Sequence, residues 1–180
     1  MIGAYFRKMT GTTQSPPRVN LAEIGWGWLG SFLGIGAVAA INYGLLDRTG
    51  LILLVGSLGA SAVLIYGAIK SPMAQPRNFV GGHLISALIG VTAYKLLAPQ
   101  LWLAAPLAVA TSLAAMHLTR TLHPPGGATA LIAVISGPPV TGLGYLYVLM
   151  PVGAGTLIML AVALLVNNLS PRRRYPEFWW

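Results

Sequence analysis

One run of nine residues, Leu122 to Ala130, constrains the fold more than any other part of the chain. It reads Leu-His-Pro-Pro-Gly-Gly-Ala-Thr-Ala and places an imidazole, two prolines and two glycines within strongly apolar sequence. Proline lacks a backbone N–H and clashes with the preceding turn, so a regular helix cannot pass through this run. In hydrocarbon each unpaired backbone group costs several kcal/mol, so broken backbone at membrane depth is buried against protein or lines a cavity. The run is therefore the first candidate for a transport site.

Composition indicates an integral membrane protein. The 180 residues are 56% hydrophobic and 8% charged, whereas soluble domains carry about 25% charged residues. The basic residues behind the net charge of +8 lie at the ends of apolar segments and in the termini. There they direct topology, which favours contact with the lipid bilayer over contact with nucleic acid. The chain contains no cysteine, which excludes disulfides and thiolate metal sites. We expect no metal and no cofactor.

Six apolar segments approach the length of about 20 helical residues that crosses ~30 Å of hydrocarbon. Two are interrupted, one by Gly56 to Gly59 and one by the proline run, and we interpret them as discontinuous spans. With the N-terminus in the cytoplasm, six crossings place nine basic residues inside and two, Arg48 and Lys95, outside, in agreement with the positive-inside rule. Four crossings would also keep both termini inside, so the charges of the tails alone do not decide between four and six crossings. The continuous segments are Ile24–Leu46, Phe79–Ala98, Leu101–Leu118 and Leu146–Val166, and the interrupted ones are Leu51–Ile69 and Thr119–Gly137.

The domain organisation follows from these segments. Residues 1–20 lack the apolar core of a secretory signal and are expected to form a basic cytoplasmic tail. Residues 21–169 form the transmembrane domain. Residues 170–180 form a second cytoplasmic tail, in which an arginine triplet precedes an interfacial aromatic anchor. The result is a multi-pass, all-α protein with both termini in the cytoplasm.

A short match indicates an internal repeat. The sequence Gly-Ala-Ser-Ala that starts at Gly59 resembles the Gly-Ala-Thr-Ala that starts at Gly127, at an offset of 68 residues. The same offset superposes the first span on the fourth and the third on the sixth, which divides the domain into repeats of about 24–98 and 101–168. Two consecutive three-span repeats have opposite orientations. This inverted topology is typical of transporters that bind substrate near the midplane, at discontinuous helices.

The two interrupted spans are expected to form the site. Each begins a half-helix, near Gly59 in the second span and near Gly127 in the fifth, where the two prolines hold the preceding chain extended. A helix N-terminus presents free N–H groups and a partial positive charge that favours an anion by about 0.3–2 kcal/mol. Glycine lets a ligand approach the backbone closely. Ser61 and Thr129 would add one hydroxyl at each end.

Several motifs resemble those of one known family. The run from His123 to Leu131, the segment Pro72-Met73-Ala74-Gln75-Pro76-Arg77-Asn78 and the triplet Gly81-Gly82-His83 are similar to the HPP family of integral membrane proteins. The likeness extends from about Trp28 to the Arg174-Tyr175-Pro176 end. It implies a bacterial or plastid protein, here placed in the inner (plasma) membrane of a bacterium, and members are linked to nitrite transport in cyanobacteria and chloroplasts. The family is often described with four spanning helices. Some members carry CBS domains; none is apparent in this sequence, so we do not expect nucleotide regulation through such a domain.

Histidines and arginines complete the candidate site. His123 precedes the double proline and could bind an anion or carry a proton, since imidazole titrates near neutral pH; the alternative is a structural hydrogen bond to a freed carbonyl. His83 is expected to face the same region. Arg77 and Arg120 could steer anions to the cytoplasmic mouth, although a topogenic role explains them equally well. The expected substrate-binding residues are Gly59, Ala60, Ser61, His83, His123, Pro125, Gly126, Gly127, Ala128 and Thr129.

These observations favour a transporter of a small inorganic anion. Glu23, Asp47 and Glu177 lie at segment ends or in loops, so the spans hold no carboxylate of the kind that cation pumps use. No nucleophile–base pair is apparent, and we do not expect an enzyme. Nitrite is the best candidate substrate, and that name rests on the resemblance alone. A passive anion channel and a non-transporting scaffold or sensor are the alternatives. A homo-oligomer is favoured because so small a bundle has little interior.

Overall fold

The computed structural model describes residues 2–180, and that part of the chain is helical without β-strands. The all-α expectation is therefore confirmed. Two α-helices continue directly into π-helical turns, α2 into η1 and α3 into η2. The elements in chain order are α1 (Ile2–Arg7), α2 (Leu21–Ile41), η1 (Asn42–Leu46), α3 (Gly56–Ala62), η2 (Val63–Gly67), η3 (Pro72–Ala74), α4 (Pro76–Leu97), α5 (Leu101–Leu118), α6 (Pro124–Ile135), α7 (Pro138–Thr141), η4 (Val148–Gly153) and α8 (Ala154–Leu169).

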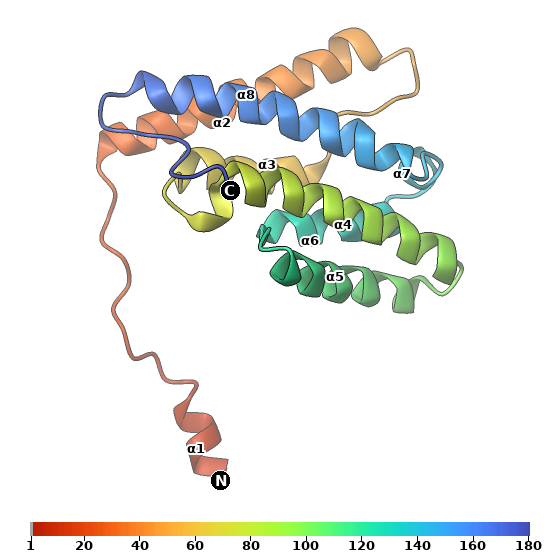
Figure 1. Ribbon diagram of the computed structural model, residues 1–180, viewed down its shortest axis with the longest axis horizontal. Helices are drawn as coiled ribbons and strands as arrows, with labels where there is room; N and C mark the ends of the chain where they lie inside the picture. Colours follow the sequence, from red (N-terminus) through yellow and green to blue (C-terminus); the bar gives the residue numbers. More distant parts are fainter. Residues whose placement is uncertain (1) are drawn as a thin grey trace.

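Four helices are long and apolar enough to cross a membrane, and two shorter apolar helices lie among them. The long ones are Leu21–Leu46, Pro76–Leu97, Leu101–Leu118 and Val148–Leu169. The short ones, Gly56–Gly67 and Pro124–Ile135, coincide with the two interrupted segments. In Figure 1, α2 and α4 begin at the same end of the bundle. The segment between them, which contains α3, therefore runs back from the end of α2 to that same end. The number of crossings stays a prediction.

Both short helices begin three residues earlier than expected. α6 begins at Pro124, because proline has no N–H to lose in the first turn and its φ is already helical. The prolines are thus the first two helical residues, and the chain is extended only up to His123, with φ −140° and ψ 105°. α3 begins at Gly56 after an extended Val55. The two starts are 68 positions apart, as in the sequence match, and the inverted orientation of the repeats stays a prediction.

The helices pack through small residues. α4 packs against both α5 and α6, and α2 runs beside α8 (Figure 1). A Cβ at Gly90 of α4 would lie 2.6 Å from the carbonyl oxygen of Ala130 in α6, so only glycine permits this approach. The side chain of Tyr66 fills the space above Gly30 and Gly34 of α2. These glycines therefore serve packing within the chain.

The C-terminal segment packs on the bundle and is not a free tail. Tyr175 is 2% exposed and donates a hydrogen bond of 2.7 Å from its hydroxyl to the carbonyl of Ala74. The backbone N–H of Glu177 donates to Gln75 Oε1 at 2.8 Å. Burial raises the pKa of the Tyr175 phenol, so its hydroxyl stays a donor at any physiological pH. Trp180 remains exposed, which is compatible with the expected aromatic anchor.

Candidate functional site

Four polar side chains from three helices meet inside the bundle, and we call them the polar cluster. They are Ser61 of α3, His83 of α4, His123 at the start of α6 and Thr129 within α6, and all four have 0% exposure. All four are among the substrate-binding residues expected from the sequence. Polar groups at membrane depth are costly and mark substrate or ion pathways. The fold thus brings the hydroxyls of both short helices and two of the three histidines to one place.

Ser61 joins the two imidazoles. Its Oγ lies 2.7 Å from Nε2 of His83 and 2.8 Å from Nε2 of His123. The same oxygen lies 3.1 Å from the carbonyl of Ser57, one turn earlier in α3. The imidazole centroids are 4.9 Å apart, with the rings tilted by 52°. One hydroxyl is therefore the shared partner of both rings.

The outer nitrogen of each imidazole also has a partner. Nδ1 of His83 lies 2.6 Å from Oγ1 of Thr129, and Nδ1 of His123 lies 2.7 Å from the carbonyl oxygen of Met73 in η3. Phe79 packs against both rings, with centroid distances of 5.4 Å to His83 and 5.3 Å to His123. The result is a continuous chain of hydrogen bonds from a threonine hydroxyl to a main-chain carbonyl.

The two hydroxyls occupy equivalent positions in the two short helices. Each belongs to the sixth residue of its helix, and each approaches the carbonyl four residues earlier: Ser61 that of Ser57 at 3.1 Å, and Thr129 that of Pro125 at 3.3 Å. The main-chain carbonyl of Thr129 accepts a further hydrogen bond of 3.1 Å from the hydroxyl of Tyr147. The hydroxyls therefore lie in the second turn of each helix and not at its end.

The first turn of α6 has fewer main-chain donors than the free N–H groups expected at a helix start. Pro124 and Pro125 have no N–H, and the N–H of Gly126 donates to the carbonyl of His123 at 2.8 Å. A Cβ at Gly126 would lie 2.8 Å from Ser86 Oγ and 2.9 Å from the Gly82 carbonyl oxygen. This glycine permits close helix packing and does not provide access for a ligand. Side chains would therefore supply most of the donors to an anion at this end of α6.

Other expected site residues lie away from the polar cluster. Gly59 and Ala60 are exposed on the opposite face of α3, because a helix turns 100° per residue and Ser61 faces inward. Gly127 and Ala128 are half-buried, and a Cβ on Gly127 would make only an ordinary contact of 3.7 Å with Val109. Pro125 is buried and takes part through its carbonyl.

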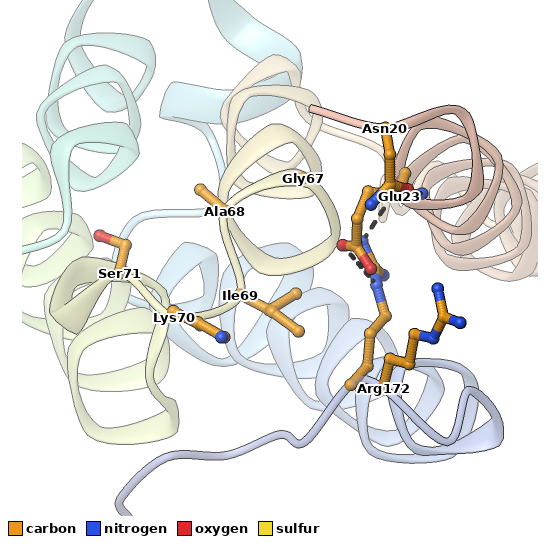
Figure 2. Close-up of a pocket in the computed structure, with 9 residues that line it drawn as sticks. Asn20, Glu23, Gly67, Ala68, Ile69, Lys70, Ser71 and Arg172 are labelled. Atoms are coloured by element: carbon orange, nitrogen blue, oxygen red, sulfur yellow. Dashed lines mark hydrogen bonds and ion pairs between the residues drawn. The ribbon is translucent and has the colours of Figure 1, made fainter. Parts of the chain in front are cut away.

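A basic cavity opens near the first turn of α2 and the segment that follows α8. Its volume is about 520 Å³, and Figure 2 shows Lys70, Arg172 and Glu23 around it. Its lining consists of Asn20, Glu23, Gly67, Ala68, Ile69, Lys70, Ser71, Arg172 and Arg173. Ser71 lies two residues before Met73, whose carbonyl contacts the polar cluster. Lys70, Arg172 and Arg173 thus concentrate positive charge in a cavity whose lining includes the segment that leads into η3.

The two arginines expected to steer anions are not in this cavity. Arg77 lies over the ring of Phe178, with 5.8 Å from its guanidinium carbon to the ring centroid. Arg120 is exposed, beyond the end of α5, with a positive φ of 57°. The basic residues that line the cavity are Lys70, Arg172 and Arg173, which sequence reasoning did not select. No local motif marked them, because the cavity is assembled from segments about 100 residues apart.

Sequence reasoning also missed a buried arginine. Arg173 is 6% exposed and donates to Glu23 Oε2 at 3.0 Å, to Asn167 Oδ1 at 3.0 Å and to the carbonyl of Tyr66 at 3.0 Å. The sequence indicated only a topogenic role for the arginine triplet, and its middle member also has these buried contacts. This residue joins the start of α2, the end of η2 and the end of α8. The planar guanidinium, with its five N–H donors, suits a buried position that offers several acceptors.

One family model matches most of the chain. It is described as HPP, transmembrane region, and it covers residues 16–176. Two curated relatives come from Dictyostelium discoideum, and their names say only that they are transmembrane proteins. One is 48% identical over 179 residues, which are 98% of this chain and 57% of the relative. The other is 45% identical over 181 residues, which are 98% of this chain and 63% of the relative.

These comparisons support a multi-pass membrane protein and give no support to a bacterial origin, because both relatives come from Dictyostelium. The chain spans about three fifths of the length of either relative. No solved structure matches it.

Proposed function

The chain belongs to the HPP transmembrane family, and from that premise we propose that it carries a small inorganic anion across a membrane through the polar cluster. The observation that carries the proposal is the position of Ser61 Oγ, 2.7 and 2.8 Å from two imidazoles on two other helices. Buried polar side chains that converge at membrane depth are typical of a substrate pathway. Broken helices around them are typical of transporters.

The side chains present suit an anion better than a cation. Hydroxyls and imidazole N–H groups donate hydrogen bonds, and no member of the polar cluster carries negative charge. The hydroxyl of Ser57, one turn from Ser61, is buried and has no hydrogen-bond partner among residues 2–180. This free donor is available to a ligand that displaces the Ser61 contacts. The basic cavity would raise the local concentration of anions at the mouth.

We propose a carrier and not a channel. Ser61, His83, His123 and Thr129 have no exposed surface, which fits an occluded form that must open to either side in turn. Movement of two inverted repeats about the polar cluster would provide that opening. In support, α3 and α6 start 68 positions apart and place equivalent hydroxyls in it.

Nitrite is the proposed substrate, and its support is the family resemblance. The charge distribution supports six crossings with both termini in the cytoplasm, so the basic cavity would face the cytoplasm. The proposal requires neither enzymatic activity nor a cofactor. It includes assembly into a homo-oligomer, in which the exposed glycine face of α3 at Gly56 and Gly59 would contact a neighbouring copy.

The test is nitrite uptake into liposomes that contain the purified protein. We expect saturable uptake that is lost in Thr129→Ala and His123→Ala. Matched controls are Thr111→Ala and His117→Ala, which change the same residue types at exposed positions of α5. Both controls should retain uptake. Nitrate, chloride and formate as competitors would define the anion class.

Three outcomes would contradict the proposal. Uptake by folded protein that is unchanged in Thr129→Ala and His123→Ala would remove the polar cluster from the pathway. No uptake of any of the four anions by folded wild-type protein would remove the transporter function and favour a scaffold or sensor. Unsaturable flux with single-channel currents would replace the carrier with a passive channel.

A further inference from the structure

We infer that His83, Ser61 and His123 form a relay that holds one exchangeable proton and passes it between the two imidazoles. The coupling of this proton to anion movement rests on the function proposed above, whereas the relay itself rests only on the hydrogen-bond geometry. The Met73 carbonyl sets the direction of the hydrogen bonds, because a carbonyl oxygen can only accept.

The resting direction of the chain follows from that acceptor. Nδ1 of His123 must carry a proton to donate to Met73, so Nε2 of neutral His123 is bare and accepts from the Ser61 hydroxyl. Because the Ser61 hydroxyl proton is donated to His123, Ser61 Oγ acts toward His83 as an acceptor and receives the hydrogen bond from Nε2–H of His83. Nδ1 of His83 is then bare and accepts from the Thr129 hydroxyl. The two histidines therefore rest as opposite tautomers.

The same atoms can accept one additional proton without loss of a hydrogen bond. When Nδ1 of His83 gains a proton, it donates to Thr129 Oγ1, and the Thr129 hydroxyl turns to the Pro125 carbonyl at 3.3 Å. Every donor still has an acceptor, and the charge lies on His83. The protonated form of His83 is possible because the Pro125 carbonyl can accept the hydrogen bond from the Thr129 hydroxyl.

Transfer to the second imidazole is a concerted step through Ser61. The Nε2–H proton of His83 moves to Ser61 Oγ as the Ser61 hydroxyl proton moves to Nε2 of His123, so one N–H and one O–H bond break and one of each forms. His123 is then the imidazolium, with Nδ1–H on the Met73 carbonyl and Nε2–H on Ser61. The Ser61 hydroxyl now points to the bare Nε2 of His83, which keeps its proton on Nδ1.

The capacity is one proton. Ring centroids only 4.9 Å apart place two imidazolium charges in strong repulsion in a low-dielectric interior. Besides the histidines, the titratable side chain within residues 2–180 that hydrogen-bonds to a residue of the polar cluster is Tyr147, whose hydroxyl donates to the Thr129 carbonyl. Glu23 lies with Arg173 at the basic cavity, Asp47 follows η1, and Glu177 belongs to the docked C-terminal segment. The imidazoles are thus the proton carriers in this part of the chain.

The first experiment is 15N NMR of histidine-labelled protein in lipid bilayers. The chain contains three histidines, and the exposed His117 serves as the internal reference. At high pH we expect the Nδ1–H tautomer for His123 and the Nε2–H tautomer for His83. In Ser61→Ala both Nε2 signals should move, and in Ser61→Thr they should return. The same tautomer on both residues, or signals unchanged in Ser61→Ala, would overturn the relay.

The second experiment measures proton and nitrite movement separately in the same liposomes, with an entrapped pH-sensitive dye and a chemical nitrite assay. We expect one proton per nitrite in wild type, loss of proton movement in Ser61→Ala, and recovery in Ser61→Thr. Nitrite uptake without protons in wild type would overturn the coupling and leave the proposed function intact. The reverse case, no nitrite uptake with the predicted tautomers present, would contradict the proposed function and leave the relay intact.

Discussion

Arg173 and Glu23 are separated by 150 positions in the sequence and form an ion pair of 3.0 Å. The arginine side chain is 2% exposed and the glutamate side chain 34%. The pair connects the segment after α8 to the first turn of α2, so the two ends of the transmembrane domain are joined at the basic cavity. Loss of the guanidinium would leave four oxygen acceptors on α2, η2 and α8 without their donor.

Arg173→Ala should destabilise the protein by about 1.5–3 kcal/mol, the cost of losing hydrogen bonds to a charged group. The measurement is thermal unfolding of purified protein in detergent. Arg172→Ala removes the same charge at an exposed neighbouring position and should be nearly neutral. Equal melting temperatures for the two variants would show that charge alone, and not the buried hydrogen bonds of Arg173, determines the effect.

Alanine substitutions at two adjacent glycines in α6 should have opposite effects on the stability of the protein. Gly126→Ala would place a Cβ 2.9 Å from the Gly82 carbonyl oxygen, and backbone cannot yield as a side chain can. Overpacking of this kind costs about 1–3 kcal/mol. Gly127→Ala meets only Val109 at 3.7 Å and should gain up to about 1 kcal/mol of helix stability. If unfolding temperatures fall equally in both variants, α6 does not pack on α4 as described.

Tyr175 should make stability depend on pH in the alkaline range. Burial raises the pKa of its phenol above the ordinary value of about 10, so the folded state holds the proton more tightly than the unfolded state. Its contribution is therefore complete below pH ~10 and declines as the pH rises further. Tyr175→Phe should cost about 1 kcal/mol at pH 7 by removing the bond to Ala74.

The difference between the wild-type and Tyr175→Phe stability curves isolates this group from the other tyrosines. It should be constant from pH 7 to 9 and shrink above pH ~10. A difference that grows with pH would mean that the tyrosinate, and not the neutral phenol, is the stabilising form.

The number of crossings can be measured directly because the natural chain has no cysteine. Single cysteines at the exposed positions Thr13, Lys70 and Gln100 can be labelled with a membrane-impermeant maleimide in oriented vesicles. Six crossings predict that Thr13→Cys and Lys70→Cys are labelled from one side and Gln100→Cys from the other. Four crossings by the long helices alone would place Thr13→Cys and Gln100→Cys together and Lys70→Cys opposite.

Local pattern was sufficient to find most of the polar cluster. Ser61 and Thr129 were identified by a repeated Gly-Ala-Ser/Thr-Ala sequence, and His123 by the prolines that break its helix. Breaks and repeats are properties of neighbouring residues, so a single sequence carries them. The helix starts were misplaced by three residues because proline in a first turn resembles a helix breaker in sequence although it stabilises that turn.

Long-range partners could not be read in the same way. Asn42 Oδ1 accepts from the N–H groups of Leu53 and Leu54, which holds the chain extended before α3, and nothing near Asn42 indicates this role. The partners of Arg173 lie on α2 and η2, and a basic residue after an apolar span is ordinarily topogenic. Such contacts depend on how helices are arranged in space, which composition and periodicity do not specify.

The Met73 carbonyl that receives the His123 N–H belongs to the main chain. No side-chain substitution at position 73 can delete it, so drift in amino-acid identity leaves the asymmetry of the two imidazoles in place. That asymmetry is a property of the route of the backbone through η3. An insertion or deletion between Ser71 and Gln75 would therefore alter the asymmetry of the two imidazoles more readily than any point mutation there. The length of this segment, and not the identity of its side chains, determines which imidazole donates to the main chain.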